Sequence, residues 1–431
     1  MDRISDLPDN VVEMIIERLP LRDAARTSTL SKKWQYKWAM LSTLCLDYIF
    51  FDTMYRQRRK PPVLIYPSLV KTILLQHIGH LQKFVIYIPN LDASGIGEIN
   101  LTIRVALMNG VQELTVIKAE GCAPHALPSF LFVCAEQITK LEFTNCVLNP
   151  PLEFRGFPNL KTLHLNAIAC SSLERLSNFI SSCPRLQRIT LSDLNKSDQQ
   201  LYIHAPSLEV FSVGGAFRSI LFQEAQNLVS LKIFLADINE GFEKVIPCND
   251  YMLQLFSKLS KIKCLKLEGY ICMVSEITLL GADYVQGALS IELDNLKTIE
   301  AVSVDLGDLR EFHCLLRLIR SAPNLQKVEI TAFRDEITIG RPCFRSDAGD
   351  YGDCNFRNLQ SVRINELMGT KAELKMIEIL LRHSPVLKVL SIQVESKLDK
   401  DAKLEVSKEL MRFCRASPTA QILCTYDEVK A

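Results

Sequence analysis

Apolar and polar residues recur in one short unit along most of the chain. The unit is an apolar residue, two further residues, a second apolar residue, one residue and a third apolar residue, as in Leu160-Lys-Thr-Leu163-His-Leu165. The alternation in its second half predicts a short β-strand with one buried face. Copies of the unit begin at Leu41 (a degenerate one), Leu81, Val111, Ile138, Leu160, Leu186, Leu208, Leu228, Ile262, Leu296, Leu325, Leu359 and Leu387.

Amphipathic helices are predicted between several of these strands, because apolar residues three or four positions apart form a stripe. The stripes are Ile99, Ile103 and Leu107; Leu173, Leu176 and Ile180; Phe312, Leu316 and Ile319; and Leu374, Ile377 and Leu381. After Val111 the units start 20 to 34 residues apart, and leucine-rich repeats have periods of roughly 20–29 residues. We therefore predict an α/β leucine-rich-repeat solenoid, with at least ten strands in a parallel sheet and helices outside it.

The residues between the strand apolars are expected to be polar and to line the concave face of this solenoid. They include Glu142, His164, Thr190, Ser212, Lys232, Lys266 and Glu329. Long intervals after Leu228, Ile262 and Leu325 predict projecting loops in the same half of the chain.

Residues 2–40 read instead as three short helices. Asp6-Leu7-Pro8-Asp9 suits the beginning of a helix, because proline is tolerated in the first turn and acidic residues favour the positive helix end. Pro20 ends this helix, a second begins at Leu21, and Ser31 is a candidate cap for a third that carries Trp34 and Trp38. A module this small is marginally stable alone. Its remaining apolar surface therefore requires a partner, either the rest of the chain or another protein.

The string DRISDLPDNVVEMIIERLPLRDAARTSTLSKKW resembles an F-box, in the form found at the start of plant F-box proteins. The resemblance implies docking on a Skp-type adaptor, which bridges to a cullin scaffold in a ubiquitin ligase. The apolar residues that would form this adaptor-binding surface are Leu7, Pro8, Ile15, Ile16, Leu19, Leu21, Leu30 and Trp34. The alternative is a helical cap over the end of the repeats, and both roles are compatible.

The end of the chain resembles the FBD segment that closes many plant F-box/leucine-rich-repeat proteins. The matching strings are NFRNLQSVRINELMG and ILLRHSPVLKVLSI, between about Cys354 and Cys424. A last helix is expected over Leu404–Phe413 and a last strand over Ala420–Thr425. The predicted domains are an F-box at residues 1–40, leucine-rich repeats at 41–352, and an FBD segment with the C-terminal cap at 353–431.

Composition narrows the possible partners. The net charge is +1, from 50 basic and 49 acidic residues, which argues against nucleic acid as the main ligand. The apolar runs are shorter than the roughly 20 residues of a membrane helix, and no signal peptide is recognised. The 14 cysteines show no Cys-x-x-Cys pair, so we interpret them as packing residues rather than zinc ligands. The expected location is the nucleus or cytoplasm, with no cofactor and no metal.

Candidate catalytic groups are few. His77 and His80 form an isolated pair, and His313-Cys314 falls within a helical stripe. Asp347, Asp350 and Asp353 lie in a glycine-rich loop that lacks the ligand spacing of a calcium-binding EF-hand. The basic run from Arg56 to Lys60 is interpreted as a solvated loop, with nuclear import or anion binding as alternatives.

We therefore expect a non-catalytic, substrate-recruiting subunit of a Skp–cullin–F-box ubiquitin ligase. The alternative is a repeat scaffold that binds proteins outside any ligase. The substrate and the residues that contact it are unknown from the sequence, but we expect contact with the concave face and long loops between about residues 230 and 360.

Overall fold

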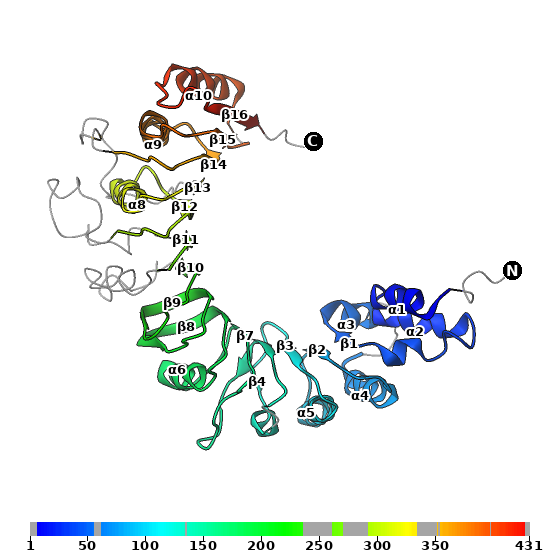
Figure 1. Cartoon of the computed structure of the whole chain (residues 1–431). Helices are drawn as coiled ribbons and strands as arrows, with labels where there is room; N and C mark the ends of the chain where they lie inside the picture. Colours follow the sequence, from blue (N-terminus) through cyan, green and yellow to red (C-terminus); the bar gives the residue numbers. More distant parts are fainter. Residues whose placement is uncertain are drawn as a thin grey trace. The chain divides into compact units, whose positions relative to one another are not determined.

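The computed structural model describes residues 7–55, 62–133, 136–235, 261–269, 292–333, 351, 354–396 and 398–426. It divides into two compact units, Met1–Ser207 and Leu208–Ala431. Each unit is described separately below, with the element labels of Figure 1. Among the described residues, no helix combines the length and hydropathy needed to cross a bilayer.

The first unit opens with short helical segments, α1 (Asp9–Glu17), α2 (Leu21–Arg26), η1 (Thr27–Thr29) and η2 (Lys37–Met40). Pro8 and Pro20 occupy the N-cap positions of α1 and α2, which explains why each helix begins there. The third segment is a run of turns that ends in the 3₁₀-helix η2, not a helix capped by Ser31. Its serine and aromatic residues favour an α-helix only weakly.

A parallel sheet follows in the first unit. Its strands pair in the order β1 (Thr43–Leu46), β2 (Lys83–Ile88), β3 (Glu113–Lys118), β5 (Lys140–Thr144), β7 (Thr162–Asn166) and β8 (Arg188–Ile203). The connections hold α3 (Tyr48–Tyr55), η3 (Pro62–Leu64), α4 (Tyr66–Gln76), α5 (Ala93–Met108), η4 (Ser129–Phe132) and α6 (Leu173–Ser181). A separate two-stranded ladder joins β4 (His125–Ala126) to β6 (Cys146–Val147), which the repeat pattern does not predict.

The second unit continues the same construction. Its strands are β9 (Val210–Phe222), β10 (Ser230–Leu235), β11 (Cys264–Glu268), β12 (Thr298–Val304), β13 (Lys327–Ala332), β14 (Ser361–Leu367), β15 (Val389–Val394) and β16 (Gln421–Tyr426), paired in that order. Its described helices are α8 (Leu309–Arg320), α9 (Lys371–His383) and α10 (Lys400–Arg412). The predicted last helix and last strand are thus confirmed.

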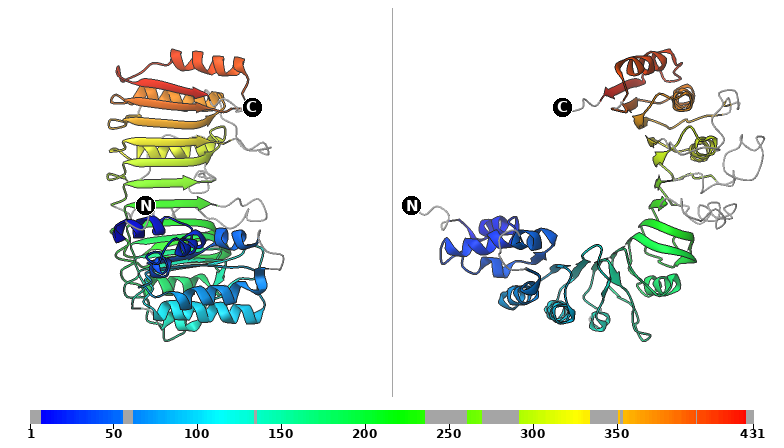
Figure 2. Two further views of the ribbon diagram at one scale, coloured as in Figure 1. Left: turned by 90° about the vertical axis from the view of Figure 1, so that its right-hand side faces the viewer. Right: turned by 180° about the vertical axis from the view of Figure 1, so that it is seen from behind.

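The repeat register places equivalent residues side by side. In the first unit Leu141 pairs with Leu163, and in the second Leu231 pairs with Leu265. Within each unit, the inward residues of successive repeats therefore form continuous buried rows. The helices cover this face of each sheet (Figure 2), and the other face, which we call the open face, carries the alternate residues. The parallel α/β solenoid is confirmed, with a strand at every predicted unit.

The predicted helical stripes also agree with the structure, apart from one shift. Ile99, Ile103 and Leu107 are buried on α5, and Leu173, Leu176 and Ile180 on α6. On α9 the buried face includes Glu373 and Met376, whereas Leu374 is only half-buried. Glu373 belongs to a capping box, in which its carboxylate accepts a hydrogen bond from the Thr370 amide at 2.7 Å. Ile377 and Leu381 are buried as predicted, so only the first residue of this stripe differs.

Two buried histidines make the stability of the fold depend on pH. Burial lowers the pKa of His125, on β4, and of His313, on α8, to about 4 each, and nearby Lys118 and Arg317 contribute in the same direction. Both ring nitrogens of His125 lack a hydrogen-bond partner in the described part of the chain. In the unfolded chain each imidazole takes up a proton near pH 6.5.

We predict that the protein loses stability as the pH falls from about 6.5 to 4, because the unfolded state binds more protons in this window. Above pH 6.5 this contribution to stability is fully present. At about 1.4 kcal/mol per pKa unit, His125 alone accounts for a loss of about 3 kcal/mol. His125→Leu should flatten the dependence of the thermal midpoint on pH. The exposed control His80→Gln should leave it unchanged, and an equally steep dependence in both variants would contradict the assignment.

Candidate functional site

The eight apolar residues predicted to bind an adaptor separate into two groups in the structure. Ile16, Leu21 and Trp34 are buried, at 1%, 9% and 2% exposure, and form the core of the N-terminal module. Pro8, Ile15 and Leu30 are exposed, whereas Leu7 and Leu19 are half-buried. The first group holds the helices together, and the other five residues remain available to a partner.

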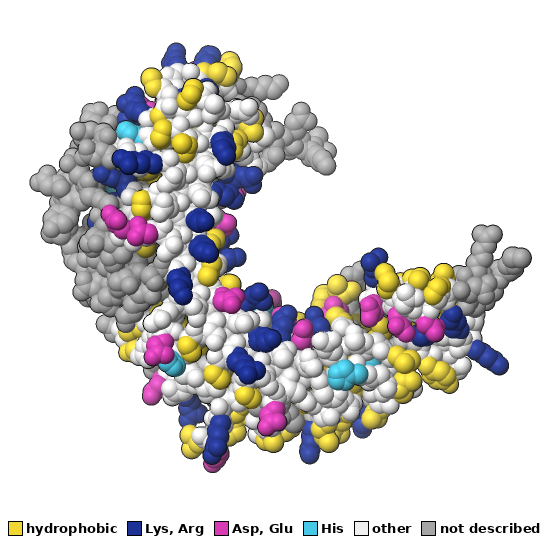
Figure 3. All heavy atoms as spheres, in the orientation of Figure 1, with side chains coloured by type: hydrophobic (Ala, Val, Ile, Leu, Met, Phe, Trp, Pro, Cys, Tyr) yellow, Lys and Arg dark blue, Asp and Glu magenta, His cyan; other side chains and the backbone are white. Residues whose placement is uncertain are grey.

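Further apolar side chains on the module also face solvent. Met14 lies next to Ile15 on α1, and Tyr36 and Met40 follow Trp34; all three are more than half exposed. Figure 3 shows hydrophobic side chains at the surface of this module, interspersed with charged ones. We define Leu7, Pro8, Met14, Ile15, Leu19 and Leu30 as the apolar surface of the module. Met14 was missed in the sequence, because its place beside Ile15 on the helix does not by itself distinguish an exposed residue from a buried one.

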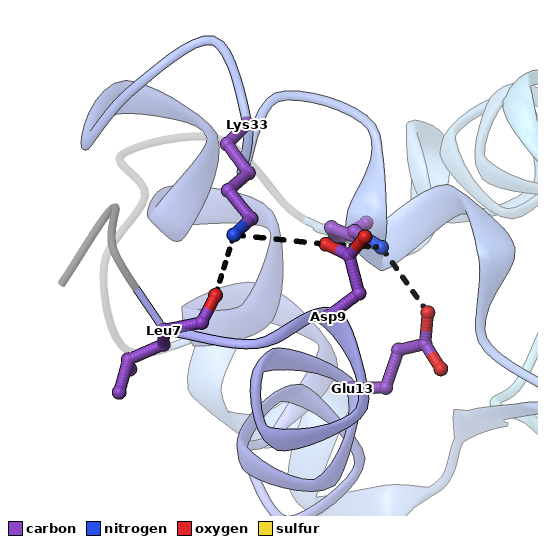
Figure 4. A network of polar contacts seen from close by, with 5 residues as sticks. Leu7, Asp9, Glu13 and Lys33 are labelled. Carbon is purple, nitrogen blue, oxygen red and sulfur yellow. Dashed lines mark hydrogen bonds and ion pairs between the residues drawn. The ribbon is translucent and has the colours of Figure 1, made fainter.

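A polar network fixes the position of Leu7 and Pro8 at the beginning of α1 (Figure 4). Lys33 donates a hydrogen bond to the Leu7 carbonyl oxygen, and its Nζ lies 3.8 Å from Asp9 Oδ1. Lys37 Nζ lies 3.1 Å from Glu13 Oε1 and 3.4 Å from Asp9 Oδ1. The hydrogen bond to Glu13 is the main cause of the raised pKa of Lys37. Two lysines from the segment after α2 therefore contact the first turns of α1 and the Leu7 carbonyl oxygen that precedes it.

The module also packs against the repeats. Helix α2 contacts strand β1, and the Ala39 carbonyl oxygen accepts a hydrogen bond from the Ile78 amide at 2.9 Å. Both roles considered for this module, cap and partner-binding element, are therefore structurally compatible.

On the open face of the first unit, the charges neutralise one another around Glu142. Its carboxylate lies 2.8 Å from Lys140 Nζ and 3.1 Å from His164 Nδ1, and accepts a hydrogen bond from Thr115 Oγ1 at 2.9 Å. The interaction with His164 is the largest cause that holds the pKa of Glu142 well below its usual range. This carboxylate is already fully paired within the fold.

The open face of the second unit carries a surplus of positive charge. One row runs in register from Ser212 through Lys232, Lys266, Glu300 and Glu329 to Arg363. Lys266 pairs with Glu300 at 3.6 Å, and Glu329 pairs with Lys327 at 2.9 Å and with Arg363 at 4.0 Å. On the strands, Lys232, Lys266, Lys327 and Arg363 stand against Glu268, Glu300 and Glu329. The exposed residues that directly precede β9, β11, β12 and β15 add one acidic side chain, Glu209, and three basic ones, Lys263, Lys297 and Lys388.

Lys232 has no carboxylate within ion-pair distance among the residues that the structure describes. Its side chain is exposed on the open face between Ser212 and Lys266. The predicted positions Lys232, Lys266 and Glu329 thus lie where expected. Glu300 and Arg363 were missed, although they occupy the same position in the units that begin at Leu296 and Leu359. The predicted loops after Leu228, Ile262 and Leu325 fall mainly outside the described residues.

Of the candidates for chemistry that the structure describes, His77 is hydrogen-bonded, His313 and Cys314 are buried, and His80 is exposed. His77 Nε2 lies 2.7 Å from the Leu41 carbonyl oxygen, and His313 and Cys314 are buried on α8. No group of three or more histidine, cysteine or acidic side chains in the described ranges is arranged to hold a metal ion. Asp347, Asp350, Asp353 and the run from Arg56 to Lys60 lie outside those ranges.

The fold and its surfaces define a helical F-box module joined to a leucine-rich-repeat solenoid. The family model of the F-box domain matches residues 4–45, and the model described as "FBD-associated F-box protein At5g56370, LRR repeats" matches residues 100–330. F-box/FBD/LRR-repeat protein At1g13570 of Arabidopsis thaliana is 34% identical, over 99% of each chain. Probable FBD-associated F-box protein At1g32375 of the same plant is 23% identical, over 98% of this chain and 99% of its own. The chain belongs to the plant F-box/FBD/LRR-repeat family.

The division of the module into core and surface predicts opposite effects for two neighbouring isoleucines. Ile16→Ala should destabilise the module by about 2–5 kcal/mol, because it empties a buried site. Ile15→Ala should cost far less, because its side chain is 37% exposed. Hydrogen exchange of the amides in residues 9–41 measures both effects. Equal loss of protection in the two variants would contradict this division.

Proposed function

We propose that this protein is the substrate-recruiting subunit of a Skp–cullin–F-box ubiquitin ligase. The observation that supports this most is the apolar surface of the F-box module, which remains exposed although the module packs on the repeats. F-box domains generally bind Skp-type adaptors and, through them, cullins. Large exposed apolar residues on a monomer commonly mark a protein-binding surface.

The proposed mechanism is proximity. The module binds the adaptor while the repeats bind a substrate, so that the substrate is held near a ubiquitin-charged enzyme at high effective concentration. This work requires no acid, base or nucleophile from the chain, and we propose a non-catalytic role in the nucleus or cytoplasm.

We further propose that the substrate binds the open face of the second unit. Extended sheet faces of repeat proteins suit protein ligands, and the basic surplus around Lys232 favours an acidic segment. The substrate-contacting residues would include Lys232 and Lys266. The alternative remains a repeat scaffold acting outside any ligase.

Adaptor binding is tested by charge placed on the apolar surface. Ile15→Asp should weaken binding of the purified protein to a Skp-type adaptor by about tenfold or more, because burial of an isoleucine contributes roughly 1.5–3 kcal/mol. The control is Ile49→Asp on α3, which lies outside the module and replaces an isoleucine of 69% exposure. Calorimetry measures both affinities. A wild-type protein that binds no Skp-type adaptor would favour the scaffold alternative.

Substrate capture is tested by charge reversal on the open face. Lys232→Glu combined with Lys266→Glu should remove acidic proteins from the set labelled by a proximity-labelling fusion in plant cells, with adaptor binding unchanged. Lys161→Glu serves as the control, because this exposed lysine precedes β7 in the first unit. An identical set of labelled proteins for the double variant and the wild type would place the substrate elsewhere.

A further inference from the structure

The last strand of the second unit has one edge that nothing in the described part of the chain covers. Strand β16 pairs with β15 from Val389 opposite Gln421 onward, and it is the last strand in the pairing order. The Gln421 amide donates to the Lys388 carbonyl oxygen at 3.0 Å. Along a parallel strand successive residues direct their backbone groups to opposite sides. The amide and carbonyl of Ile422 therefore point away from β15, toward the uncovered edge.

A hollow of about 290 Å³ adjoins this edge, lined by Ser407, Leu410, Met411, Arg415, Ile422 and Cys424. The equivalent inward residues of β15, Leu390 and Ile392, are buried because β16 and α10 follow them. Ile422 and Cys424 are only half-buried, and Met411 on α10 is 80% exposed. The hollow thus lies where one more strand of the array would place its inward side chains. Its volume is at the lower end of the range of small-molecule pockets, roughly 300–1,000 Å³.

Arg415 gives the hollow a positive charge. Its guanidinium donates to the Ala420 carbonyl oxygen at 3.2 Å, and no carboxylate lies within ion-pair distance among the described residues. The neighbouring cations of α10 are neutralised, because Lys408 pairs with Glu405 and Arg412 with Glu409. A ligand that enters beside the beginning of β16 therefore meets a cation without a carboxylate partner.

We propose that this end of the solenoid binds an extended segment of a partner protein, which adds to β16 as a parallel strand. The segment carries apolar residues at alternate positions, whose side chains enter the hollow, and an acidic residue before them that pairs with Arg415. Backbone hydrogen bonds to Ile422 provide affinity, and the hollow provides specificity, as in other cases of strand addition. The residues that line the hollow belong neither to the F-box module nor to the row of charged residues on the open face.

The probe is a fluorescent peptide, Asp-Val-Leu-Ser-Ile-Gln-Val, which copies residues 389–394 of β15 behind an aspartate. Fluorescence anisotropy with the full-length protein measures its affinity. Met411→Asp should weaken binding by about tenfold or more, a change of about 1.4 kcal/mol. Leu404→Asp is the matched control, because it introduces the same charge on α10 at an exposed leucine outside the hollow. The affinity of the Leu404→Asp variant for the peptide should stay within about twofold of that of the wild type.

The peptide backbone supplies a second test. N-methylation of the serine and glutamine amides, which face β16 in this register, should abolish binding. N-methylation of the leucine and isoleucine amides, which face away, should preserve it. Failure of the wild type to bind the probe, or equal effects of the two methylation patterns, would overturn the proposal.

Two other possible occupants of this edge are distinguished by two further measurements. Light scattering that shows a wild-type dimer and a monomeric Met411→Asp variant would assign the edge to a second copy of the chain. Binding of the probe at least tenfold tighter to a chain that ends at Tyr426 would assign the edge to residues 427–431. Either result would overturn the proposed partner segment.

Discussion

The structure depends on the burial of leucine-rich rows between consecutive repeats. A single repeat has a short strand with two inward apolar residues, such as Leu163 and Leu165, and cannot shield them from water alone. Parallel pairing in register brings the corresponding residues of the next unit alongside them. Each fully buried leucine contributes roughly 1.5–3 kcal/mol, so the stability of such an array comes mainly from contacts between neighbours. The same register aligns the alternate residues on the open face, where polar side chains are available for recognition.

An array that is stabilised by contacts between neighbouring repeats has, at each end, a row of inward apolar residues that no further repeat covers. At the beginning of the first unit, α2 packs against β1 and reduces this exposure. The module can therefore stabilise the array and still present Pro8, Ile15 and Leu30 to another protein. At the end of the second unit, β16 and α10 leave Ile422 and Met411 incompletely covered. The apolar residues that remain available to a partner therefore belong to the F-box module at one end and to β16 and α10 at the other.

The repeat pattern predicted the fold because strand period and burial are local properties of the sequence. Every unit from Leu41 to Leu387 corresponds to a strand, and the amphipathic stripes correspond to α5, α6, α8 and α9. The role of individual F-box residues was not predictable in this way. Ile15 and Ile16 are chemically identical neighbours, and only the packing of α1 against the segment after α2 separates surface from core. Helices α3 and α4 also went unpredicted, because their apolar residues do not form a narrow stripe. Three ion pairs of the open face, Glu142 with His164, Lys266 with Glu300 and Glu329 with Arg363, join residues of neighbouring repeats and depend on register rather than on sequence spacing.

The role that we propose for the F-box module is to join this chain to a ligase through the exposed apolar residues near its N-terminus. Hydrogen–deuterium exchange of the full-length protein, with and without a purified Skp-type adaptor bound to cullin, tests it most directly. The account predicts new protection of the amides between about residues 8 and 30, with exchange in strands β9 to β16 unchanged. Absence of a stable complex, or protection confined to the repeats, would contradict it.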